Sequence, residues 1–153
     1  MAGTFFDTSA LGKYYHQEIG TAKVDELLTD TDATAFISRL SAVELHSVFA
    51  KKVRTKAILP ADFELLRQRF STDLRRRRFQ IVRVTSPDFV LATKLIRRIG
   101  LEQNLRTLDA LQLAIALGLR EKSLVNQFVC ADQSLCSIAA AEGLTVINPE
   151  LVG

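Results

Sequence analysis

The stretch that most constrains the fold is the run from Leu105 to Leu119, LRTLDALQLAIALGL. From Leu108 onward its residues are apolar except Asp109, Gln112 and Gly118. A helix that is apolar on all sides is normally buried on more than one side. The sequence therefore predicts a buried helix inside a layered domain, with a carboxylate at its start.

Asp109 needs an explanation, because an unpaired buried charge costs several kcal/mol or more. We expect Thr107 to be the N-cap of this helix, which puts Asp109 in the first turn, where a carboxylate stabilises the helix dipole. Alternatively, Asp109 binds a cation. The local sequence leaves both roles open.

Short apolar runs alternate with helical patterns along the rest of the chain. We expect strands at residues 3–6, 35–38, 79–84, 125–131 and 144–147, and helices that begin near residues 8, 22, 41, 60, 85, 107 and 133. Such alternation predicts a three-layer α/β/α fold with a mainly parallel central sheet. We expect a single domain that spans residues 1–153.

The composition is that of an ordinary globular protein, with 48% hydrophobic and 24% charged residues. Its two cysteines, Cys130 and Cys136, form neither a disulfide framework nor a CxxC motif, which favours a reducing cytoplasm. The N-terminus lacks the pattern of a signal peptide, and no run of about 18 apolar residues occurs. We therefore expect a cytoplasmic protein that does not contact a membrane.

The net charge of +3 does not by itself indicate a nucleic-acid-binding protein. The basic residues are nevertheless clustered, at Lys51, Lys52, Arg54 and Lys56 and again at Arg75–Arg78. Runs of this kind usually form a solvated face.

Four carboxylates fall at corresponding places in the expected fold. Asp7 and Asp132 directly follow strands, Glu44 lies near the start of the helix after another strand, and Asp109 opens the buried helix. In a parallel α/β sheet, strand ends and helix starts lie along one edge. Helix capping explains each acid singly, and Ser41-x-x-Glu44 matches a capping box, but capping does not explain four acids together. Whether Glu44 serves the cap, a metal or both stays open.

A divalent cation would relieve the repulsion between four neighbouring carboxylates. Ligation by oxygen alone favours Mg²⁺, with Mn²⁺ as a substitute, over zinc. The sequence contains no Cys/His zinc spacing, Walker loop, GxGxxG or GxSxG motif that would indicate another chemistry. We therefore expect a magnesium site at the carboxyl edge of the sheet.

Four segments, FFDTSAL, SAVEL, RTLDALQLAIAL and FVCADQSL…AAAEGLTVINPE, occur in an order and spacing that resembles the PIN-domain ribonucleases. The resemblance covers essentially the whole chain and is greatest to the VapC-type toxins of type II toxin–antitoxin pairs. It implies a Mg²⁺-dependent endoribonuclease that leaves 3′-hydroxyl and 5′-phosphate ends. It also implies a homodimer and a cognate antitoxin, a segment of which lies in a groove near the acids.

The resemblance also implies roles for individual residues. The acids that bind the metal and carry catalysis would be Asp7, Glu44, Asp109 and Asp132. The hydroxyl that supports the pocket would be that of Thr8 or Ser9. The arginine run at Arg75–Arg78 matches no motif of the family, and its role stays open. Because the acidic pocket repels the RNA backbone, basic residues outside it are expected to attract RNA: Arg106, Lys51, Lys52 and the arginine run. Such attraction should weaken steeply with salt.

Three other readings compete with this one. An aspartyl phosphatase of the haloacid-dehalogenase type would use Asp7 as nucleophile, but it needs a second acid two residues later, where Ser9 stands. A PIN-like module could hold RNA or a protein without cutting. Finally, the four acids could be independent helix caps in a domain of another function. Cleavage of RNA separates the nuclease from the binding module. If the acids are only helix caps, a carboxylate-to-amide change should affect stability rather than activity.

Overall fold

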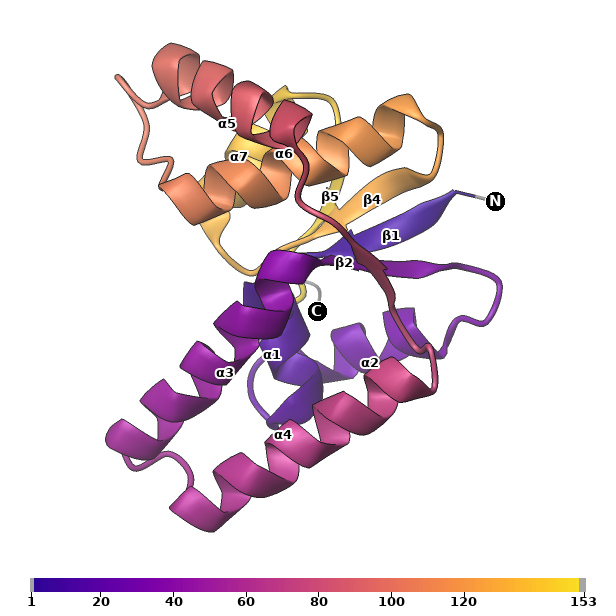
Figure 1. The fold of residues 1–153 in the computed structure, drawn as a ribbon, viewed down its shortest axis with the longest axis vertical. Helices are drawn as coiled ribbons and strands as arrows, with labels where there is room; N and C mark the ends of the chain where they lie inside the picture. Colours follow the sequence, from indigo (N-terminus) through magenta and orange to yellow (C-terminus); the bar gives the residue numbers. More distant parts are fainter. Residues whose placement is uncertain (1, 152–153) are drawn as a thin grey trace.

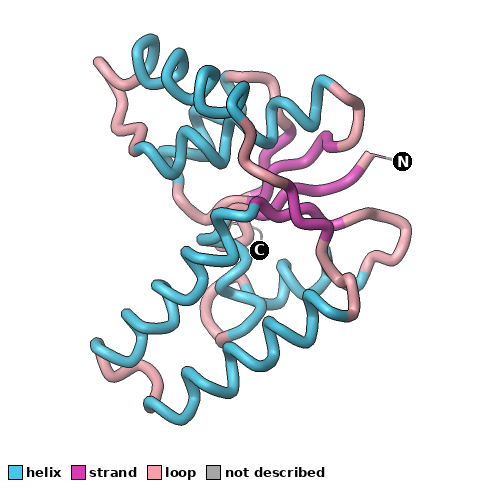
Figure 2. The backbone as a smooth tube through the Cα atoms, viewed as in Figure 1, coloured by secondary structure: helices cyan, strands magenta, loops and turns pink. Residues whose placement is uncertain are grey.

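The computed structural model describes residues 2–151 and is built around a five-stranded sheet (Figures 1 and 2). The strands are β1 (Gly3–Phe6), β2 (Ala35–Ser38), β3 (Gln80–Val82), β4 (Val125–Val129) and β5 (Thr145–Ile147). Their order in the sheet is β3-β2-β1-β4-β5, and every neighbouring pair is parallel. The expected parallel sheet is confirmed, although β3 and β4 are shorter than the apolar runs that contain them.

Helices cover both faces of the sheet. They are α1 (Thr8–Tyr15), α2 (Thr21–Thr29), α3 (Arg39–Arg54), α4 (Pro60–Arg75), α5 (Ser86–Ile99), α6 (Thr107–Glu121) and α7 (Gln133–Ala141). Figure 1 shows α1 to α4 on one side and α5 to α7 on the other, which confirms the three-layer α/β/α fold. Within residues 2–151, none of the helices is both long enough and apolar enough to span a bilayer.

The sheet separates two hydrophobic cores, because successive side chains of a strand point to opposite faces. On β1, Phe5 packs into the core shared with α5, α6 and α7, whereas Phe6 packs into the core shared with α1 to α4. Every residue of α6 from Ala110 to Leu117 is buried. The expectation that this helix is buried is therefore confirmed, and its first turn is fixed in place by its packing.

The start of α3 differs from the sequence prediction. The helix begins at Arg39, and its N-cap is Ser38, whose Oγ accepts the Ser41 backbone N–H at 3.3 Å. The prediction of a capping box between Ser41 and Glu44 is therefore wrong. Ser38 ends β2 in an extended conformation and already supplies the cap, so Glu44 lies in the second turn and its carboxylate bonds elsewhere.

The N-cap predicted for α6 is also wrong. Arg106 is the last extended residue before the helix and occupies the N-cap position without a side-chain hydrogen bond, while Thr107 is already helical. Asp109 nevertheless stays in the first turn, as expected. Parallel pairing completes the arrangement: the Asp7 backbone N–H donates to Val129 O at 2.9 Å, which brings the ends of β1 and β4 together.

We predict that Leu113→Ala lowers the free energy of unfolding by about 2–5 kcal/mol, because it removes a side chain from the core and leaves a cavity. Leu113 is fully buried on α6. The matched control is Leu101→Ala, since Leu101 is 87% exposed in a loop and its truncation should change stability by less than about 0.5 kcal/mol. Urea denaturation measures both variants. Equal, small effects would contradict the central position of α6 in the core.

Candidate active site

All four predicted acids line one cavity of about 870 Å³. Asp7 follows β1, Glu44 lies on α3, Asp109 opens α6 and Asp132 follows β4. The cavity lies at the carboxyl edge of the sheet because parallel strands end on the same side. The expected convergence of the four acids is therefore observed.

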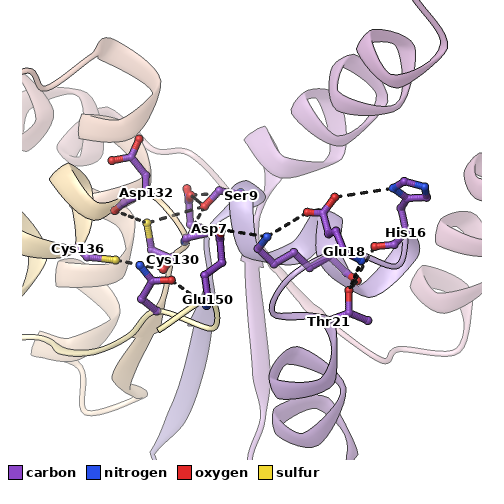
Figure 3. A network of polar contacts seen from close by, with 12 residues as sticks. Asp7, Ser9, His16, Glu18, Thr21, Cys130, Asp132, Cys136 and Glu150 are labelled. Atoms are coloured by element: carbon purple, nitrogen blue, oxygen red, sulfur yellow. Dashed lines mark hydrogen bonds and ion pairs between the residues drawn. The ribbon is translucent and has the colours of Figure 1, made fainter. Parts of the chain in front are cut away.

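Asp7 is the most buried of these acids, at 5% exposure, and it is the N-cap of α1. Its Oδ2 accepts the Ser9 hydroxyl at 2.7 Å and the Ser9 backbone N–H at 3.3 Å. Ser9 Oγ in turn accepts the Ala131 backbone N–H at 3.0 Å. Ser9 thus connects the first acid to the segment that carries Asp132, as Figure 3 shows. Asp7 Oδ1 forms no hydrogen bond within the described chain.

Glu44 is held by a polar network that joins α1, α3 and α6. Its Oε1 accepts Thr8 Oγ1 at 3.1 Å and Gln112 Nε2 at 3.0 Å. The hydroxyl of Ser41 lies 2.9 Å from both Thr8 Oγ1 and Gln112 Nε2. Glu44 Oε2 stays free of hydrogen bonds within residues 2–151.

Sequence reasoning assigned no site role to two members of this network. Gln112 is only 1% exposed, and its amide donates to Glu44 from within α6. The signal that could have identified it was its polarity within an otherwise apolar helix. Ser41 offered no such signal, because its hydroxyl suited a helix cap equally well.

The remaining two acids are less enclosed. Asp132 is the exposed N-cap of α7, and its Oδ1 accepts the Leu135 backbone N–H at 2.9 Å. Asp109 is half-buried and makes no side-chain hydrogen bond to the rest of the described chain. Capping is therefore real for Asp7 and Asp132, but it uses only one oxygen of each carboxylate and leaves the other for a ligand.

The acids perturb one another electrostatically. Burial raises the pKa of Asp109 to about 6, and the charges of Asp7 and Asp132 add to the shift while Arg106 partly offsets it. Burial likewise raises the pKa of Asp7, with a further contribution from Glu44. Burial also raises the pKa of Glu44, and repulsion from the charge of Asp109 raises it further. Within residues 2–151, none of the four carboxylates forms an ion pair with a lysine or arginine.

The donors fit a hard divalent cation. Uncompensated carboxylate oxygens around a water-accessible cavity are typical ligands of Mg²⁺, which binds through one or two carboxylates and keeps several of its waters. Among residues 2–151, no three or more Asp, Glu, His or Cys side chains are grouped closely enough to hold a metal ion directly.

The predicted RNA-binding residues divide into two groups. Lys51 and Arg106 line the acidic cavity. Lys52 does not line it, and its ammonium forms an ion pair with Glu18 at 2.8 Å. The arginine run lies between the end of α4 and the start of β3, at the amino edge of the sheet and opposite the acids.

Solved structures share the fold at low sequence identity. FitAcB from Neisseria gonorrhoeae aligns with a TM-score of 0.67 and 17% identity over 97% of this chain and 99% of that chain. VapC20 from Mycobacterium tuberculosis, described as a toxin that cleaves the sarcin–ricin loop, gives 0.66 and 15% identity over 95% and 98%. FitAB bound to an IR36 DNA fragment gives 0.68 and 15% over 98% and 97%.

Sequence comparison with curated proteins finds no significant match. The sequence model of the PIN domain, in contrast, matches residues 4–147, which include all four acids and, apart from Gly3, all five strands. The chain therefore belongs to the PIN-domain family.

Proposed function

We propose that this protein is a Mg²⁺-dependent endoribonuclease and the VapC-type toxin of a toxin–antitoxin pair. The observation that carries the proposal is the cavity lined by four carboxylates that no lysine or arginine of residues 2–151 neutralises by an ion pair. Membership of the PIN-domain family supports nuclease chemistry. The shared fold with a toxin that cleaves the sarcin–ricin loop supports RNA as the substrate.

In this proposal the metal is held by Asp7, Glu44, Asp109 and Asp132. Bound Mg²⁺ supplies a water of lowered pKa and offsets negative charge on the phosphate. Ser9 fixes one oxygen of Asp7 and leaves the other for the ligand. Thr8 and Gln112 do the same for Glu44, so the protein fixes both carboxylates before the substrate arrives.

A carboxylate of the site also accepts the proton of the attacking water. Asp109 suits this role, because it lines the cavity and its side chain makes no hydrogen bond to the rest of the described chain. In-line attack of the water oxygen on phosphorus then breaks the bond between phosphorus and the 3′ oxygen. The leaving 3′ oxygen takes a proton from solvent, so the products are 3′-hydroxyl and 5′-phosphate ends. Lys51 and Arg106 attract the RNA backbone to the same cavity.

The proposal includes two protein partners. A cognate antitoxin would lie in the groove beside the acids and place a basic side chain among them; failure of a co-encoded small protein to inhibit cleavage would count against it. A second copy of the chain would form a homodimer. Phe89 and Val90 on α5 are 54% and 56% exposed and offer apolar contact area for it, which sedimentation velocity tests directly.

We predict that Asp7→Asn abolishes RNA cleavage while leaving the fold intact. The amide keeps the shape of the side chain but removes a buried metal-binding charge, so the loss should be about 100-fold or more. The assay follows a mixed pool of tRNA and ribosomal RNA in Mg²⁺, in Mn²⁺ and in EDTA. Circular dichroism verifies that the variant is folded.

The matched control is Asp30→Asn, which changes an exposed acid in the loop between α2 and β2 and should retain full activity. Cleavage that survives both EDTA and Asp7→Asn would refute the metal-dependent mechanism. A folded wild type that binds RNA without cutting it, free of any antitoxin, would favour the non-cleaving PIN-like module instead.

We also predict that the metal-free protein becomes less stable as the pH rises from about 4 to about 6 through the titration of Asp109. The pKa of this carboxyl is raised from 3.8 to about 6 in the folded state, so the folded protein binds the proton more tightly than the unfolded chain does. Stability is then fully present below pH 3.8 and is lost as the pH passes through 6.

Urea denaturation in EDTA across this pH range measures the effect, and Asp109→Asn is the comparison. The variant should show a shallower decline than the wild type, because the amide does not ionise. At neutral pH, added Mg²⁺ should stabilise the wild type more than the variant. Parallel pH profiles for the two proteins would show that the titration of Asp109 does not cause the loss of stability.

A further inference from the structure

A second cavity, of about 560 Å³, is lined by Arg39, Ile81, Arg83 and Val84. Arg39 directly follows β2 and Arg83 directly follows β3. Ser38 and Val82, the last residues of these strands, are partners in the parallel register. Because neighbouring strands lie about 4.8 Å apart, the two arginines leave the sheet side by side.

These arginines have no counter-charge within the described chain. Both are exposed, and neither forms an ion pair or a side-chain hydrogen bond there. By contrast, the guanidinium groups of Arg67, Arg78 and Arg98 each pair with a carboxylate. Two adjacent guanidinium groups repel each other, and an anion between them would remove that repulsion.

The lining of this cavity suits one kind of anion. Guanidinium groups bind phosphate through paired hydrogen bonds and retain their charge at every physiological pH. Ile81 and Val84 add apolar surface beside the charges. A phosphate that is attached to an apolar group, as in a nucleotide of a single strand, would contact both.

This cavity lies at the same edge of the sheet as the acids. The sheet order places Arg83 at β3, Arg39 at β2, Asp7 at β1 and Asp132 at β4, all at the carboxyl edge. The ends of β3 and β1 are two strand spacings apart, or about 10 Å. Arg39 also belongs to α3, the helix that carries Glu44, and β2 and β3 lie side by side in Figure 1.

We propose that Arg39 and Arg83 form a phosphate-binding subsite for single-stranded RNA, next to the acidic cavity. The proposal rests on the nuclease function proposed above. The acids repel the RNA backbone, so attraction has to come from charges beside them. Arg39 and Arg83 hold a backbone phosphate of a neighbouring nucleotide, on the flank away from Asp132, and so fix the direction in which the strand crosses the edge.

The test compares the double variant Arg39→Ala/Arg83→Ala with the control Lys94→Ala/Lys122→Ala. The control also removes two exposed positive charges, from the middle of α5 and from the end of α6 that is opposite its acid. RNA binding is measured in an Asp7→Asn background so that the strand is not cut. Cleavage is measured separately with the acid intact, on oligonucleotides of about 3 and about 10 nucleotides, the longer being within the range of single-strand sites.

The expected result is about a tenfold loss of affinity for the longer oligonucleotide at moderate salt, with the slope of log K against log salt reduced by about 0.7, as one lost phosphate contact requires. In cleavage, KM for the longer substrate should rise about as much while kcat is retained. The shorter substrate, which fills only the acidic cavity, should be cut equally well by the variant and the wild type. The control variant should change affinity and cleavage only slightly, and by the same factor for both oligonucleotides.

Four outcomes would overturn the subsite. Equal losses on both oligonucleotides would show that the arginines act on the acidic cavity itself. A loss matched by the control would reduce their role to overall charge. Unchanged RNA affinity with weakened antitoxin binding would assign the arginines to the protein partner. If the wild type cuts RNA and the double variant behaves as wild type, only the subsite fails, whereas absence of cutting by the wild type is a failure of the nuclease proposal.

Discussion

Repulsion between four carboxylates around one cavity is the constraint on which the rest of the structure depends. Such a cluster stays together only if the backbone positions of its members are fixed elsewhere. The parallel sheet fixes two of them, because β1 and β4 pair along their length and deliver Asp7 and Asp132 to the same edge. The all-round burial of α6 fixes Asp109, and Ser9 fixes Asp7 against the end of β4.

The hydrogen-bond network that holds Glu44 includes a buried acceptor without a partner, which lowers stability. Gln112 Nε2 lies within hydrogen-bond distance of three oxygens, while its Oε1 is buried without a partner among the described residues. An unsatisfied buried acceptor typically costs about 1–3 kcal/mol. Turning the amide would satisfy that oxygen but would place it against the Glu44 carboxylate. The fold thus retains a local loss of stability that holds the Glu44 carboxylate in position, as functional sites commonly do.

Sequence patterns were sufficient to predict those features of the fold that a single segment of the chain determines. The strands, the buried α6 and the four acids at the sheet edge were all predictable, because apolar runs and helix starts are local signals. The caps of α3 and α6 were not, since the N-cap is set by the last extended residue, Ser38 or Arg106, rather than by the best capping side chain nearby. Gln112 was noticed but could not be placed, because its partners Thr8 and Glu44 are 104 and 68 residues away in the chain.

Charge is the property for which local sequence was the poorest guide. The densest basic run, Arg75–Arg78, lies at the amino edge, and Arg78 pairs with Asp73 and stacks over Tyr14. Arg39 and Arg83 are isolated in the sequence, yet the sheet order places them together and beside the acids. In a parallel α/β fold, a residue's distance from a strand's carboxyl end decides whether its charge can act at the site. The positive charge beside the acids therefore comes from single residues that follow successive strands, and counting charges along the chain does not reveal it.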